Sequence, residues 1–126
     1  MKIGMTSVFV NNPIEAFKFY TEILGFVKIM YMPEHYLAIV ASAEDPEGTT
    51  LLLEPNDSPI AQNYQTELRK AGLPCIVFKT DDIQNEYQRL KELGVAFTKE
   101  PTKTEWGTEA IFDDTCGNYI QLHQMP

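Results

Sequence analysis

The feature that most constrains the fold is an internal repeat. Two segments with helical patterning share matching positions 69 residues apart: Asn12/Asp81, Ile14/Ile83, Leu24/Leu93 and Gly25/Gly94. In each segment a capping side chain precedes an apolar stripe at helical spacing, and a glycine ends the stripe. Solenoid repeats have shorter units of about 20–50 residues. The repeat therefore predicts two copies of one larger module.

Each copy is patterned as strand, helix and three further strands. In the first copy the patterning predicts strands at 3–10, 26–32, 36–43 and 49–54, with a helix after Asn12. In the second copy it predicts strands at 75–79 and 95–98, a helix after Asp81 with the stripe Ile83, Tyr87, Leu90 and Leu93, and a closing hairpin. We expect an α+β fold and, from the length, one domain spanning 1–126. Its modules would span about 1–55 and 73–126, and 61–70 between them would form a helix or a crossing linker.

The closing hairpin, from Phe112 to His123, is patterned as strand, tight turn and strand, with polar side chains on one face of its last strand. Its turn contains four turn-forming residues, Asp113, Asp114, Gly117 and Asn118. After the turn, Ile120 and Leu122 share one face of the strand, and the other face carries Tyr119, Gln121 and His123. This strand is therefore expected to bury one apolar face and to present a hydrogen-bonding face.

Charge and composition exclude several classes of partner. The formal net charge of −8 argues against nucleic acid and against an anionic membrane surface. No apolar run approaches the roughly 20 residues that span a bilayer, and the N-terminus has no signal-peptide core. Two cysteines, Cys75 and Cys116, form no disulfide framework, so a reducing cytoplasm is the expected location.

Three motifs, in this order, resemble the vicinal-oxygen-chelate superfamily of glyoxalases, bleomycin-resistance proteins and extradiol dioxygenases. The first is Phe19-Tyr20-Thr21-Glu22-Ile23-Leu24-Gly25, and the second is Thr80-Asp81-Asp82-Ile83. The third is Trp106-Gly107 followed by 112–122, which is similar to the family's closing Phe-x-Asp-Pro-x-Gly-Asn-x-Ile-Glu-Leu. The resemblance covers essentially the whole chain. It implies two βαβββ modules whose U-shaped mixed sheets surround a cavity, and commonly a homodimer.

The chain departs from this family at the metal-binding positions. Metal-dependent members place His or Glu at four strand positions that fall here on Met5, Leu51 or Leu52, Cys75 (Pro74 by a strict repeat offset) and Gln121. A thioether, an alkyl group, a thiol and an amide are poor ligands for the cations that carboxylate and imidazole bind. We therefore expect no metal and no cofactor. A displaced divalent-metal site formed by Glu54, Cys75 and His123 is the alternative.

Three functions remain open at this point. The first is a metal-free small-molecule-binding protein similar to the bleomycin-resistance branch. The second is an enzyme of the lyase, isomerase or dioxygenase type, which would use a displaced metal or metal-free chemistry. One metal-free arrangement has Cys75 as the nucleophile and His123 as its base, but we assign no catalytic residues. The third is a regulatory or interaction module.

The expected ligand-binding residues are Met5, Ser7, Leu52, Glu54, Cys75, Trp106, Tyr119, Gln121 and His123. Trp106 is expected in a proline-containing loop, where it covers a pocket mouth or packs beneath the loop.

Overall fold

The structure is a computed structural model that describes residues 1–126. The chain divides into two compact units, 1–64 and 65–126, and the boundary falls within helix α2 (Pro59–Lys70). The expected modules, 1–55 and 73–126, each lie within one unit. That the whole chain acts as a single domain stays a prediction. None of the helices has both the length and the apolar character that crossing a membrane requires.

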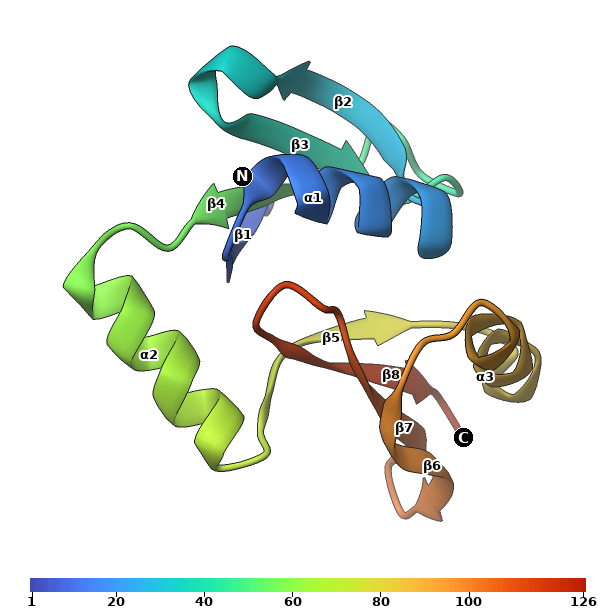
Figure 1. Ribbon diagram of the computed structural model, residues 1–126. Helices are drawn as coiled ribbons and strands as arrows, with labels where there is room; N and C mark the ends of the chain where they lie inside the picture. The colour runs from blue at the N-terminus through green and yellow to red at the C-terminus, as the bar shows by residue number, and fades with distance from the viewer. The chain divides into compact units, whose positions relative to one another are not determined.

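The first unit contains a four-stranded mixed sheet and the helix α1 (Figure 1). Its elements are β1 (Met5–Val10), α1 (Pro13–Lys18) with a π-helical continuation (Phe19–Ile23), β2 (Val27–Met32), β3 (Leu37–Ala41) and β4 (Thr50–Pro55). The strand order is β1-β4-β3-β2, with β1 parallel to β4 and the other pairs antiparallel. α1 packs against β3 and β4 and so covers one face of this sheet.

The second unit repeats this topology. Its elements are β5 (Pro74–Lys79), α3 (Ile83–Glu92), β6 (Phe97–Thr104), β7 (Gly107–Asp113) and β8 (Tyr119–Gln124). The strand order is β5-β8-β7-β6, again with the first and last strands of the module paired in parallel. The predicted α+β fold of two βαβββ modules with mixed sheets is confirmed.

The buried faces follow the alternation expected of strands. In the first unit Val8, Val10, Leu51 and Leu53 are buried on the α1 side. In the second unit the buried side chains on the α3 side include Ala110, Phe112, Ile120 and Leu122, together with Ile83 and Leu90 from the helix. These side chains make the two cores, so the opposite face of each sheet remains for other contacts.

The predicted start and end of α3 are wrong by small amounts. Asp82, not Asp81, is the N-cap, because its Oδ1 accepts the backbone N–H of Asn85 at 3.1 Å. The helix ends at Glu92, so Leu93 lies beyond the buried stripe and is exposed. The two N-caps, Asn12 and Asp82, are therefore 70 residues apart and not 69. The 69-residue spacing does hold for the glycines that follow the helices, Gly25 and Gly94, which share a φ of +87°.

The proline-containing loop expected before Trp106 is also wrong, because the residues from Pro101 to Thr104 belong to a strand. β6 continues to Thr104 and pairs with β7, so Trp106 lies in the tight turn of this hairpin. Proline is tolerated here because β6 is an edge strand, and the pairing register shifts between Lys99 and Thr102. The uncertain segment 61–70 lies in a regular helix, and Ser58 Oγ accepts the N–H of Ala61 at its start.

Candidate functional site

Predicted site residues lie on the face of each sheet that is opposite its helix. In the first unit these are Met5, Ser7, Leu52 and Glu54, whose strand positions alternate with the buried valines and leucines. We call this surface the methionine face; it comprises Met5, Ser7, Phe9, Met30, Met32, Leu37, Ile39, Leu52 and Glu54. The corresponding surface of the second sheet is the polar face; it comprises Val77, Lys79, Lys99, Glu109, Ile111, Asp113, Tyr119, Gln121 and His123. Each face is described within its own unit.

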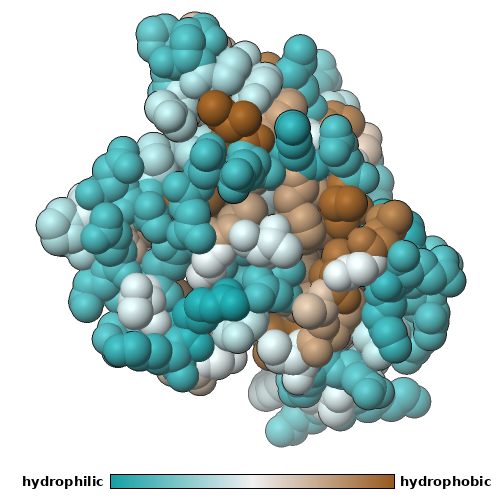
Figure 2. All heavy atoms as spheres, in the orientation of Figure 1, coloured by the Kyte–Doolittle hydropathy of each residue, from teal (hydrophilic) through white to brown (hydrophobic).

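The methionine face is a mostly apolar surface that extends across all four strands. Strand pairing places Ser7, Leu52, Ile39 and Met30 in one row across all four strands. Met5, on the β1 edge, is 50% exposed, and Met30, on the β2 edge, is 45% exposed. In the space-filling view, hydrophobic side chains appear as separate patches within a largely hydrophilic surface (Figure 2). Thioethers on both outer strands make this face a soft, adaptable apolar surface.

One end of the methionine face combines a carboxylate with aromatic rings. Glu54 pairs in register with Phe9 on the neighbouring strand. Phe9 also meets Tyr64 edge-on, with ring centroids 6.2 Å apart. Glu54 takes part in none of the ion pairs of the structure. The face thus ends in one carboxylate that forms no ion pair, next to Phe9, whose ring meets Tyr64.

Most of the charged side chains of the polar face form ion pairs. Gln121 faces Ile111 on one side and Val77 on the other, and His123 lies between Glu109 and Lys79. Lys99 Nζ donates to Glu109 Oε1 at 2.6 Å. This face can therefore offer an amide, an imidazole and a phenol as hydrogen-bonding groups.

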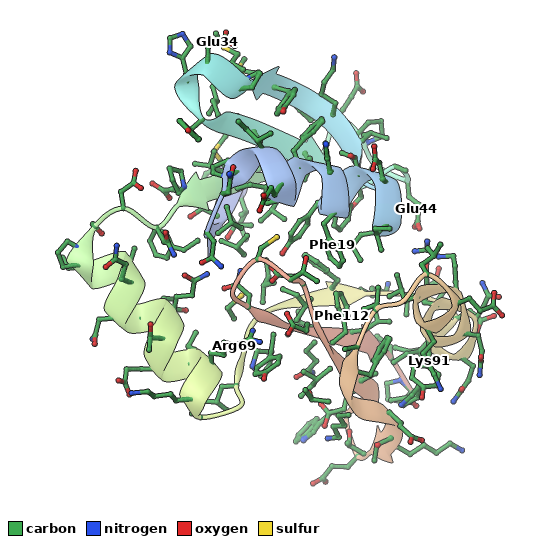
Figure 3. All side chains as sticks on the ribbon, in the orientation of Figure 1. Phe19, Glu34, Glu44, Arg69, Lys91 and Phe112 are labelled. Carbon is green, nitrogen blue, oxygen red and sulfur yellow. The ribbon has the colours of Figure 1, made fainter.

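Arg69 of α2 covers part of this face. Its Nη2 donates to Asp113 Oδ2 at 2.8 Å, and its guanidinium lies 4.6 Å from the centroid of the Tyr119 ring (Figure 3). Burial of Asp113 opposes its ionisation, but the hydrogen bond from Arg69, the N–H of Thr115 and the attraction of Arg69 outweigh this and lower the pKa of Asp113. The hydrogen bond with Asp113 likewise raises the pKa of Arg69.

Acid is expected to remove the stabilisation that this ion pair contributes. Because the pKa of Asp113 is lower in the folded state, its contribution is present above the unfolded-state pKa of about 3.9 and is lost as pH falls through the folded-state pKa. Arg69→Met should cost up to about 1 kcal/mol of unfolding free energy at pH 7, and less as the pH falls below the unfolded-state pKa of Asp113 and through its lowered folded-state pKa. Urea denaturation over a pH series measures this.

Lys70→Met is the control, because Lys70 lies on the same helix and makes only a 3.9 Å contact with Glu67 between two exposed side chains. It should change the unfolding free energy little at any pH. An equal loss for Arg69→Met at acid and neutral pH would show that the charge pair is not what stabilises this contact.

Trp106 and His123 are joined within the second unit. His123 Nε2 lies 3.0 Å from the carbonyl oxygen of Trp106 and donates a hydrogen bond to it in the tautomer protonated at Nε2. The Trp106 side chain is 75% exposed, so it does not pack beneath a loop. The structure thus brings Trp106, Tyr119, Gln121 and His123 to the second sheet, on or beside the polar face.

Cys75 is poorly suited to nucleophilic or thiolate chemistry. It is half-buried at a register irregularity of β5, between Pro74 and Ile76. Burial, and then the charge of Asp114, raise the pKa of its thiol to about 11. The group therefore stays a thiol at neutral pH, whereas attack and metal ligation need the thiolate.

The residues at the family's metal positions do not fit a metal site. They supply a thioether, an alkyl chain, a protonated thiol and an amide, and these are not the ligands that hard or borderline cations prefer. The structure also contains no group of three or more His, Cys, Asp or Glu side chains placed to hold a metal ion. We assign no step to a metal.

Sequence reasoning missed several residues that lie on or beside the two faces. Arg69 lies on a helix about 50 residues from Tyr119, and no local pattern signals that contact. The Phe9–Tyr64 contact also joins distant segments. Glu109 was detectable, because strict alternation along β7 places it on the side opposite Ala110 and Phe112.

Comparison with known proteins gives concordant matches over nearly the whole chain. The family model Glyoxalase/Bleomycin resistance protein/Dioxygenase superfamily matches residues 2–122. The uncharacterized protein YurT of Bacillus subtilis (strain 168) is 51% identical, over 98% of this chain and 99% of the relative. The uncharacterized protein YetH of the same strain is 34% identical, over 98% of each chain.

Two solved structures are similar at 28% identity. UcmS2 matches with a TM-score of 0.81 over 98% of this chain and 97% of the other. TnmS3, an antibiotic binding protein from Streptomyces sp. CB03234, matches with a TM-score of 0.76 over 100% and 97%.

Proposed function

Since this chain belongs to the glyoxalase/bleomycin resistance protein/dioxygenase superfamily, we propose that it is a small-molecule-binding protein of the bleomycin-resistance type. The motif resemblance seen in the sequence is thereby confirmed at the level of the family. A fold that carries many activities does not assign one, so the proposal depends on the residues. The methionine face carries it, because ligand sites are mostly apolar surfaces with few orienting polar groups.

The chemistry of the side chains supports binding without turnover. The family's metal positions lack suitable donors, and Cys75 is held as a thiol. Gln121 cannot act as a base, because an amide has no basic site at neutral pH. The description of TnmS3 as an antibiotic binding protein adds support from a structural neighbour. We include in the proposal that the protein holds no resident metal, forms a homodimer and works in the cytoplasm as one domain.

The test is a calorimetric screen of the whole chain against bleomycin and a panel of other natural-product antibiotics. At least one compound should bind the wild type, and Leu52→Arg should weaken it at least about tenfold, because the charge would replace apolar contact at the centre of the methionine face. Ile60→Arg is the matched control, since Ile60 is 82% exposed on α2.

The two variants separate site loss from a general effect of added charge. Ile60→Arg should leave both binding and the melting temperature near the wild-type values. A compound that binds Leu52→Arg as tightly as the wild type would place its site away from this face. Chemical turnover of any member of the panel would favour the enzyme alternative.

A further inference from the structure

Resting on this proposed function, we infer that the methionine face is built for one ligand class, a flat aromatic molecule that carries a protonated amine. Two independent features of the face lead to this class. One is the concentration of thioethers on the face, and the other is the Glu54 carboxylate at one end, which neighbours the Phe9 ring of the Phe9–Tyr64 pair.

The aromatic body of the ligand is matched by the thioethers. Three of the five methionines of the chain, Met5, Met30 and Met32, lie on this one face, and the other two, Met1 and Met125, are at the chain ends. A methionine sulfur contacts an aromatic ring favourably and its side chain adapts to ring shape. Leu37, Ile39 and Leu52 add flat aliphatic surface between the outer methionines.

The cationic group is matched by the charge at the end of the face. Glu54 is the one charged residue there, and neither lysine nor arginine occupies any strand position of the face. Phe9 is the neighbour of Glu54 on the adjacent strand, and the Tyr64 ring meets the Phe9 ring edge-on; ammonium groups bind well near a carboxylate and aromatic ring faces. The net charge of −8 further disfavours an anionic ligand.

The two parts lie at a distance that one small molecule can span. Glu54 and Leu52 are same-face neighbours on β4, so their Cα atoms lie about 7 Å apart. An amine one carbon from a bicyclic ring reaches the carboxylate while the ring covers the row formed by Leu52, Ile39 and Met30. The face therefore favours a compact aromatic amine over an anion or a saturated ring.

The test uses three probes with one carbon skeleton: 2-naphthylmethylammonium, 2-naphthylmethanol and the saturated decahydronaphthylmethylammonium. Protein labelled with 13C at the methionine methyl groups is titrated with each probe. The naphthyl amine should shift the signals of Met5, Met30 and Met32 and leave those of Met1 and Met125 in place. It should bind about threefold tighter than its saturated analogue, although the saturated ring is the more apolar.

Glu54→Gln separates the charge from the shape of the site. This variant should weaken the naphthyl amine about fivefold at low salt, less so at high salt, and leave 2-naphthylmethanol within about twofold. Glu47→Gln, in the exposed loop after β3, is the control and should change neither.

Some outcomes would overturn the ligand class while leaving the proposed function intact. Equal effects of Glu54→Gln on the amine and the alcohol would do so, as would shifts confined to Met1 and Met125. The antibiotic screen with Leu52→Arg judges the proposed function separately. No binding of the naphthyl amine at all would also overturn the ligand class, whatever that screen finds.

Discussion

Asp114→Ala is expected to lower the free energy of unfolding by about 3–5 kcal/mol, because it removes the acceptor that organises the turn between β7 and β8. The Asp114 side chain is fully buried. Its Oδ1 accepts the backbone N–H groups of Cys116 and Asn118 at 2.7 and 3.0 Å, and its Oδ2 accepts Asn118 Nδ2 at 2.9 Å. Truncation leaves three buried donors without this acceptor. Guanidinium denaturation measures the loss.

An exchange of the two turn residues tests whether hydrogen bonding is the cause. In Asp114→Asn alone, two amide NH₂ groups can face each other and the bond to Asn118 is lost. In the double variant Asp114→Asn/Asn118→Asp, the amide and the carboxylate exchange places, and Gln65 Nε2, which donates to Asn118 Oδ1 at 3.2 Å, retains an acceptor. The double variant should therefore recover at least half of the stability that Asp114→Asn loses.

A matched surface substitution completes this design. Asp57→Ala removes an exposed carboxylate outside the sheets and should change the unfolding free energy by less than about 0.5 kcal/mol. If Asp114→Ala were no more destabilising than Asp57→Ala, the carboxylate would not be what holds the turn. If the double variant recovered nothing, backbone geometry would be the dominant effect.

Local patterning explains most of the fold that could be predicted. The alternation at Ile120 and Leu122 gave the correct buried face of the closing strand. Gly25 and Gly94 were predicted as helix ends, and both adopt a positive φ that glycine accepts without a Cβ clash. These signals are readable because each depends on neighbours within a few residues.

Features that depend on tertiary contacts were not predictable in the same way. The extent of β6 is one example: Pro101 suggests a loop, and only pairing with β7 makes an edge strand of that segment. Arg69 is another, because its contacts with Asp113 and Tyr119 join a helix to strands more than 40 residues away. The candidate site was therefore predicted as strand faces, and the charged side chains that border it were missed.

Gly107→Ala is expected to destabilise the second unit by about 3–4 kcal/mol. Gly107 begins β7 with a φ of +132°. A Cβ added there would clash with the backbone carbonyl oxygen of Gln124 and lie 2.9 Å from His123 Nε2. The backbone of β8 cannot retreat without losing its pairing with β7, and the His123 ring would lose its hydrogen bond to the Trp106 carbonyl.

Gly94→Ala separates backbone strain from this steric clash. Gly94 also has a positive φ, +87°, but nothing lies within 4 Å of an added Cβ. It should cost only about 1–2 kcal/mol, the strain of the left-handed conformation alone. Trp106 is the single tryptophan of the chain, so its fluorescence should shift in Gly107→Ala and stay unchanged in Gly94→Ala. Equal losses in the two variants, with no spectral change, would mean that the contact with β8 yields easily and that Gly107 serves conformation alone.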